Sequence, residues 1–126
     1  MINRLHKIAV VTEDVEGAVQ FYTRTLGLEV LERFPTPEGE DFVFLKAGDT
    51  ILELMPKKVM KTDVGFHHIS FRVEDMDASV RELKEKGVRL EREPGEANSS
   101  GLRLAFFRGP DEVYLQLFER HQPTKP

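Results

Sequence analysis

The sequence has 126 residues, a formal net charge of −4 and no cysteine. This length is typical of one domain with a modest core, and the negative charge argues against binding to nucleic acid or to an anionic membrane surface. The lack of cysteine excludes disulfides, thiolate metal sites and cysteine nucleophiles. No apolar run is long enough for a membrane-spanning helix, and no signal-peptide pattern is present, so we expect a cytoplasmic protein.

The strongest pattern in the sequence is an internal repeat. The segment Leu5–Asp14 reappears as Phe66–Asp75, 61 residues further along the chain. Each copy leads into a helical pattern that begins after an aspartate and ends before a glycine. A repeat of this length in so short a chain predicts two copies of one supersecondary unit.

The first copy predicts one helix among four strands. Residues 5–12 are rich in β-branched and apolar residues, which is typical of a strand. Asp14 is a good N-cap, apolar residues follow at helical spacing to Leu26, and Gly27 is a typical C-terminal stop. Three further strands are predicted at residues 28–34, 41–47 and 50–55, the last two as a hairpin that turns at Gly48-Asp49.

The second copy repeats this order. Asp75 caps a helix that ends at Gly87, and strands are predicted at residues 88–92, 102–107 and 113–118. The expected fold class is α+β, with a single domain over residues 1–126. We divide it into a first βαβββ module over 4–55, a linker over 56–64, a second module over 65–119 and a tail over 120–126.

Each predicted module covers one face of its sheet with a helix and leaves the other face bare. Two modules can close their bare faces around a shared cleft, which is the expected place for a ligand. Alternation along the strands predicts that Lys7, Glu53, His68 and Gln116 point to this bare face. Lys7 matches His68 in the repeat, and Glu53 matches Gln116. One polar residue in a strand is usually only solvated or hydrogen-bonded, but four at equivalent positions favour a ligand site.

The same alternation places two other histidines away from the expected cleft. His6 and His67 are the more obvious pair in the repeat, but they alternate with Lys7 and His68. We therefore expect them to be polar caps at the edge of the helix-facing layer.

These motifs resemble the vicinal oxygen chelate superfamily, which contains glyoxalase I, methylmalonyl-CoA epimerase, fosfomycin-resistance enzymes, extradiol dioxygenases and bleomycin-resistance proteins. The resemblance covers almost the whole chain. It implies the two-module fold, a small-molecule ligand and a homodimer. The segments that carry it are Lys7–Asp14, Phe21-Tyr22, Leu26–Leu28, Gly65–Val73 and Gly109–Leu117.

The resemblance also implies one divalent metal ion, such as Zn, Ni, Co, Mn or Fe, which holds two neighbouring oxygens of a substrate. Glu53, His68 and Gln116 match three of the four ligand positions of the metal-dependent members. Lys7 stands at the fourth, and an ammonium group has no lone pair to offer a metal. The alternative is a site without metal, in which the charge of Lys7 takes its place.

Three functions remain open. The first is a metal-dependent lyase or isomerase, similar to lactoylglutathione lyase, that acts on a small α-oxo or vicinal-oxygen substrate with Glu53 as the proton-transfer base. The second is a metal-free protein that sequesters a small molecule, as bleomycin-resistance proteins do. The third is a metal-free enzyme in which Lys7 and Glu53 supply the electrostatics. Glu53 and His68 match ligand positions of the metal-dependent members, and a protein that only sequesters a molecule has no need for them. We therefore favour an enzyme.

The predicted substrate contacts extend beyond the four polar positions. Ser70 and Arg72 share the face of His68, and Arg72 can serve as a second cation for a carboxylate or phosphate. Tyr114 and Phe118 share the face of Gln116 and are expected to form the apolar wall. With Lys7, these residues complete the predicted substrate-binding set.

Overall fold

The structure is a computed structural model that describes residues 2–96 and 102–120; the predicted tail after residue 120 lies outside them. The described elements, in chain order, are β1 (Ile2–Thr12), α1 (Val15–Gln20), a π-helical turn η1 (Phe21–Thr25), β2 (Glu29–Phe34), β3 (Phe42–Ala47), β4 (Thr50–Pro56), α2 (Lys57–Met60), β5 (Gly65–Val73), α3 (Met76–Glu85), β6 (Leu90–Glu96), β7 (Leu102–Arg108), a 3-10 turn η2 (Pro110–Glu112) and β8 (Tyr114–Arg120).

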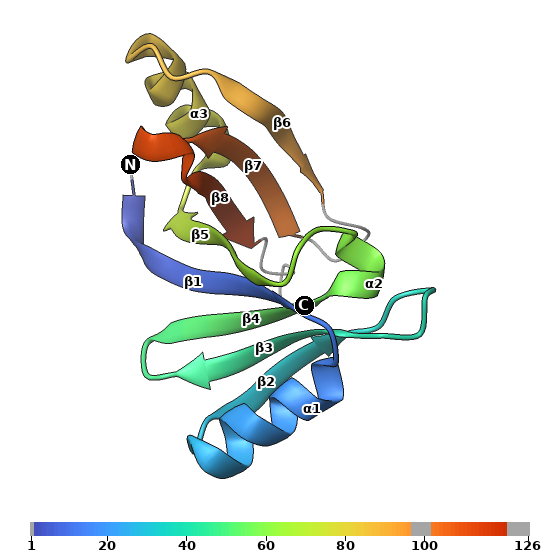
Figure 1. Cartoon of the computed structure of the whole chain (residues 1–126). Helices are drawn as coiled ribbons and strands as arrows, with labels where there is room; N and C mark the ends of the chain where they lie inside the picture. Colours follow the sequence, from blue (N-terminus) through green and yellow to red (C-terminus); the bar gives the residue numbers. More distant parts are fainter. Residues whose placement is uncertain (1, 97–101, 121–126) are drawn as a thin grey trace, which may run out of the picture. The chain divides into compact units, whose positions relative to one another are not determined.

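The chain forms two compact units, and their boundaries fall inside β1 and β5. The first unit contains residues 7–68, and the second contains residues 2–6 together with the described residues from 69 onward. In the first unit the strand order is β2-β3-β4-β1, with only the β1–β4 pair parallel. In the second unit the described strands have the order β6-β7-β8-β5, and among them only the β5–β8 pair is parallel. This confirms the predicted α+β class with two βαβββ modules (Figure 1).

Helix α1 forms where the sequence predicts it. The side chain of Asp14 accepts a hydrogen bond of 3.0 Å from the backbone N–H of Gly17, which caps the first turn. One face of the helix packs against β3 and β4. The buried residues of this core are Val15, Val19, Val43, Leu45 and Leu54. The last turn is π-helical rather than α-helical, and Gly27 follows it with a φ of 80°.

Helix α3 is built in the same way in the second unit. Asp75 accepts a hydrogen bond of 3.0 Å from the N–H of Ala78, and Gly87 follows the helix with a φ of 85°. The carboxylate of Glu119 in β8 also accepts a hydrogen bond of 2.9 Å from the buried N–H of Met76. The helix packs on β7 and β8 through a core of Val73, Met76, Val80, Leu83, Ala105, Phe107 and Leu117.

Two segments differ from the prediction. The predicted linker contains the short helix α2, whose Met60 packs against the cluster of Ala9, Val11 and Met55; four residues are too few for a helical period to show in the sequence. The strand β6 continues past Pro94 to Glu96. Because β6 lies at the end of its sheet, the missing N–H of the proline costs it no partner on the outer side.

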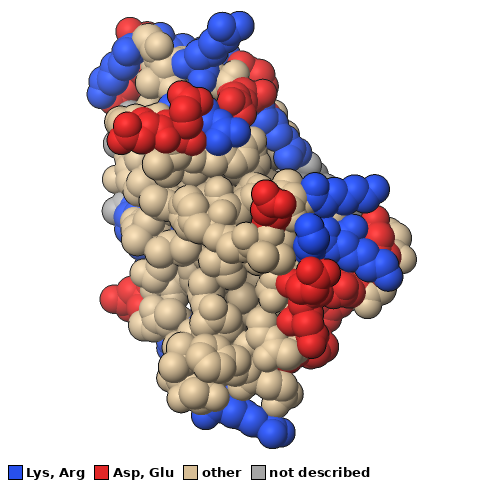
Figure 2. All heavy atoms as spheres, viewed as in Figure 1, with Lys and Arg blue, Asp and Glu red and all other residues tan. Residues whose placement is uncertain are grey.

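On each unit, Figure 2 shows a stretch of uncharged surface as well as groups of charged side chains. In the first unit several large apolar side chains are exposed around α1 and β2, namely Phe21, Leu26, Val30 and Leu31. Exposed apolar groups of this kind are common at protein–protein contacts, but the homodimer stays a prediction. Within the described residues no helix has the length and apolar character needed to cross a membrane.

Candidate functional site

The first unit carries an ion pair on the sheet face opposite α1. Lys7 of β1 and Glu53 of β4 lie with Nζ and Oε1 3.4 Å apart, and their side chains are only 2% and 11% exposed. In the parallel register Lys7 pairs with Ile51 and Glu53 pairs with Ala9, so the ion pair runs diagonally between neighbouring strands. The structure therefore joins the two residues that the sequence predicts as catalytic.

Phe44 is a neighbour of this pair that sequence reasoning missed. Its ring centroid lies 5.9 Å from Nζ of Lys7, within the range where a cation is attracted to an aromatic face. The signal was present in the sequence. A hairpin that turns at Gly48-Asp49 pairs residue 47 with residue 50, and the same register places Phe44 directly opposite Glu53.

Burial and pairing act on Lys7 in opposite directions. Burial lowers the pKa of the Lys7 ammonium group, because the charged form loses its hydration, while the charge and hydrogen bonding of Glu53 raise it part of the way back. The ammonium form therefore depends on the carboxylate beside it. A ligand oxygen that approaches the pair meets a positive donor and a carboxylate together.

His68 of β5 is the third predicted polar residue in the first unit, and it is buried. Its Nδ1 lies 2.8 Å from Nδ1 of His67. Burial lowers the pKa of the His68 imidazole to about 3, and the charges of Lys7 and His67 add to this effect. His68 is therefore a neutral imidazole near pH 7. His67 is half-buried and contacts His68, its neighbour in the chain, and its role as a polar cap stays a prediction.

In the second unit, Ser70 and Gln116 stand where Ala9 and Glu53 stand in the first unit. Ser70 of β5 and Gln116 of β8 are both buried and pair in register, and the hydroxyl of Ser70 donates a hydrogen bond of 2.7 Å to Oε1 of Gln116. In the first unit the residue beside Glu53 is Ala9, which has no hydroxyl to donate. Glu53 interacts with Lys7, whereas the amide oxygen of Gln116 is held by Ser70.

The position of His6 differs from the prediction, because its ring contacts Phe118. The ring of Phe118 is buried, and the ring of His6 packs on it with centroids 4.4 Å apart. His6 is itself buried, so it belongs with Phe118, on the face of Gln116, rather than at the edge of the helix-facing layer. Arg72 is half-buried and pairs in register with Phe118, which keeps these predicted contacts on neighbouring strands.

Tyr114 lies in an aromatic stack at the start of β8. Its ring stacks on Phe106 with centroids 4.7 Å apart and an interplanar angle of 13°, and the guanidinium carbon of Arg108 lies 4.1 Å from its centroid. Burial raises the pKa of the Tyr114 hydroxyl, with the nearby charge of Glu91 as a smaller cause. Tyr114 is therefore a neutral, half-buried ring, and its role as a wall residue stays a prediction.

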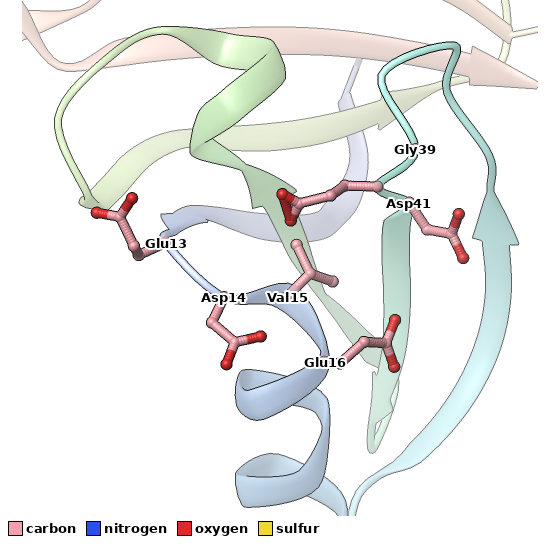
Figure 3. Close-up of a pocket in the computed structure, with 7 residues that line it drawn as sticks. Glu13, Asp14, Val15, Glu16, Gly39 and Asp41 are labelled. Atoms are coloured by element: carbon pink, nitrogen blue, oxygen red, sulfur yellow. The ribbon is translucent and has the colours of Figure 1, made fainter.

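A separate open hollow of about 420 Å³ lies at the start of α1 (Figure 3). It contains none of the predicted site residues, and much of its negative charge is engaged. Asp14 caps α1, and Arg33 forms ion pairs of 2.8 and 3.2 Å with Glu16 and Asp41. We assign it no binding role. Its lining residues are Glu13, Asp14, Val15, Glu16, Gly39, Glu40 and Asp41.

Comparison with known proteins decides the family. The family model of the Glyoxalase/Bleomycin resistance protein/Dioxygenase superfamily matches residues 4–117. The chain belongs to this superfamily. The match spans both units, as expected for a fold of two similar modules. It also agrees with the resemblance predicted from the sequence.

Three relatives illustrate which members of the superfamily the chain is similar to. It is 31% identical to mitochondrial methylmalonyl-CoA epimerase of Bos taurus, with 87% of this chain and 69% of that protein aligned. It is also 31% identical to a probable chloroplastic lactoylglutathione lyase of Arabidopsis thaliana, with 90% of this chain but only 35% of that protein covered. A solved methylmalonyl-CoA epimerase in complex with methylmalonyl-CoA and an ammonium ion matches with 27% identity, a TM-score of 0.79 and full coverage of both chains.

The superfamily resemblance implies a divalent metal, but the polar groups of the first unit fit such an ion poorly. Glu53 already faces the ammonium group of Lys7, and the amide oxygen of Gln116 accepts a hydrogen bond from Ser70. Within residues 2–96 and 102–120, no group of three or more His, Asp or Glu side chains is placed to hold an ion. The predicted ligands Glu53 and His68 lie in the first unit and Gln116 lies in the second, so the predicted ligand set stays a prediction.

Proposed function

We propose that the chain is an isomerase or lyase that acts on a small carbonyl compound with a second oxygen close by. Glu53 moves a proton at the carbon beside the carbonyl, and Lys7 holds the carbonyl oxygen. The observation that carries this proposal is the buried ion pair between Lys7 and Glu53 in the first unit.

The chemistry follows from the charges of the pair. Removing a proton from a carbon next to a carbonyl places negative charge on the carbonyl oxygen, and a fixed cation stabilises that charge as it develops. A carboxylate within reach of the carbon can take the proton and return it. Lys7 and Glu53 are one such cation and one such base, held side by side on a sheet where little water competes.

The length of the ion pair supports entry of a ligand oxygen. Charge-assisted N–H···O hydrogen bonds are usually about 2.7 to 2.9 Å long, whereas Nζ of Lys7 lies 3.4 Å from Oε1 of Glu53. The contact is therefore looser than the strongest pairs of this kind. A ligand oxygen can bind Nζ and leave the carboxylate available as a base.

The relatives support the same class of reaction and substrate. An epimerase and a lyase both match nearly the whole of this chain, and the ligands in their names carry a carbonyl group together with further oxygens. A complex that holds methylmalonyl-CoA together with an ammonium ion shows that such a cation is compatible with this fold and ligand. Lys7 would supply an ammonium group from the chain itself.

Proton exchange tests this proposal directly. The purified protein is incubated in D2O with a panel of small acyl thioesters and α-oxo acids, including methylmalonyl-CoA, and loss of the proton beside the carbonyl is followed by NMR. We expect exchange with at least one compound, and a loss of roughly 10²- to 10⁴-fold in the Glu53→Gln variant, as is usual when a general base is removed.

The exposed Lys46 provides a control on the same unit. The Lys46→Ala variant should exchange protons as fast as the wild type. Compounds that bind the wild type without any exchange would contradict the enzyme assignment and favour the alternative of a binding protein that sequesters its ligand.

A further inference from the structure

We propose that the side chain of Lys7 takes the place of the divalent metal in the first unit and excludes such an ion from the carboxylate of Glu53. The inference deepens the proposed function, since it concerns the cation of the same site. It rests on the placement of the groups, however, and needs no particular reaction to be correct.

The first argument is the space beside Glu53. A divalent ion such as Zn²⁺ binds a carboxylate oxygen at about 2.0 to 2.2 Å. Nζ of Lys7 lies 3.4 Å from Oε1 of Glu53, so an ion bound on the Lys7 side of the carboxylate would be in direct contact with the lysine. An ammonium group repels the ion and has no lone pair with which to bind it.

The second argument is that Lys7 is buried and held in this position by two contacts. The residue is 1% exposed, and Phe44 lies over its nitrogen with a centroid distance of 5.9 Å. Moving the nitrogen aside would break its contacts with both Glu53 and the aromatic ring. An aromatic ring attracts an ammonium group but supplies no ligand to zinc or nickel, so the surroundings of this position suit an organic cation.

The third argument is the remaining donor set of the first unit. Apart from Glu53, the predicted ligand in this unit is His68, and one of its ring nitrogens is bonded to His67 at 2.8 Å. One carboxylate and one imidazole are two donors, fewer than the three protein ligands of a typical catalytic zinc site. The described residues add no third His, Asp or Glu to them.

Metal titration without any substrate tests the inference. Protein purified without chelator is titrated with Zn²⁺, Ni²⁺, Co²⁺ and Mn²⁺ by calorimetry, and the visible spectrum of the Co²⁺ sample reports on coordination. We expect no binding tighter than micromolar in the wild type. The Lys7→His variant should bind Zn²⁺ or Co²⁺ roughly 100-fold more tightly, because it replaces the repelling cation by a ligand.

A matched variant and a reversal experiment complete the test. Lys46→His places a histidine at an exposed lysine of β3, and it should bind no better than the wild type. Submicromolar binding by the wild type that Glu53→Gln weakens would overturn the inference, and so would a folded Lys7→His variant that binds no metal. The wild-type titration decides the matter even if Lys7→His does not fold. A failure of the proposed reaction would leave all of these results unchanged.

Discussion

His68 makes the stability of the protein depend on pH in a defined direction. Its pKa is about 3 in the folded chain, mainly because of burial, against 6.5 for an ordinary histidine. As the pH falls, the unfolded chain therefore takes up this proton before the folded chain does. Linkage then requires the free energy of unfolding to decrease with falling pH. The contribution of His68 is fully present above pH 6.5 and is lost between there and about pH 3.

The size of this loss of unfolding free energy follows from the pH range between the two pKa values of His68. Each pH unit across which only the unfolded state binds the proton costs about 1.4 kcal/mol. Between pH 7 and pH 5 the His68 proton is taken up almost entirely by the unfolded chain. The expected loss of unfolding free energy from this one group is therefore about 2 kcal/mol over that range.

Urea unfolding at pH 7 and pH 5 measures this loss in the wild type and in His68→Asn. The difference between the two proteins removes the contribution of the acidic side chains, which titrate in both. The wild type should lose about 2 kcal/mol more than the variant between these pH values. The His67→Asn variant keeps His68 and should keep most of the wild-type slope. Equal losses in the wild type and His68→Asn would refute the reasoning.

Three further changes test how α3 is held. Glu119→Leu leaves the buried N–H of Met76 without its acceptor, and we expect thermal and urea unfolding to show a loss of about 1 to 3 kcal/mol. Asp75→Ala removes the cap on the N–H of Ala78 and should cost about 1 kcal/mol by the same measurement. Gly87→Ala forces a side chain into a φ of 85°, and its unfolding midpoint should fall by the equivalent of roughly 1 kcal/mol.

Matched positions serve as controls for these three changes. Glu85 lies exposed at the end of α3, so Glu85→Leu and Glu85→Ala should be nearly neutral. Gly95 has no positive φ, and a Cβ added there would meet nothing closer than 3.9 Å, so Gly95→Ala should be tolerated. A loss at a control as large as at its partner would argue that the named hydrogen bond or backbone angle is not the cause.

Local signals in the sequence were sufficient for most of the fold. Asp14 and Asp75 marked the helix starts because their side chains accept from backbone N–H groups. The period of two along the strands placed Lys7 and Glu53 on one face, and the structure joins them. Alternation works here because β1 and β4 pair without a bulge between Lys7 and Thr12.

His6 shows where such reasoning fails. Alternation gives the direction of a side chain relative to its neighbours, but it does not say which part of the protein covers each face. The boundary between the two compact units falls between His6 and Lys7. His6 packs with Phe118 in the second unit, while Lys7 pairs with Glu53 in the first. Successive residues of one strand thus serve different units, which no local pattern reveals.

The π-helical turn η1 coincides with a difference in length between the two copies of the repeat. From cap to stop, the first helical segment runs from Asp14 to Gly27, whereas its counterpart runs from Asp75 to Gly87 and is one residue shorter. A π turn results when one extra residue enters a helix and the flanking turns keep their positions. The five residues of η1 (Phe21–Thr25) accommodate the extra residue of the first segment, and the strands that carry Lys7 and Glu53 pair in regular register. Deleting one residue from this turn should therefore yield a regular helix with the sheet register intact.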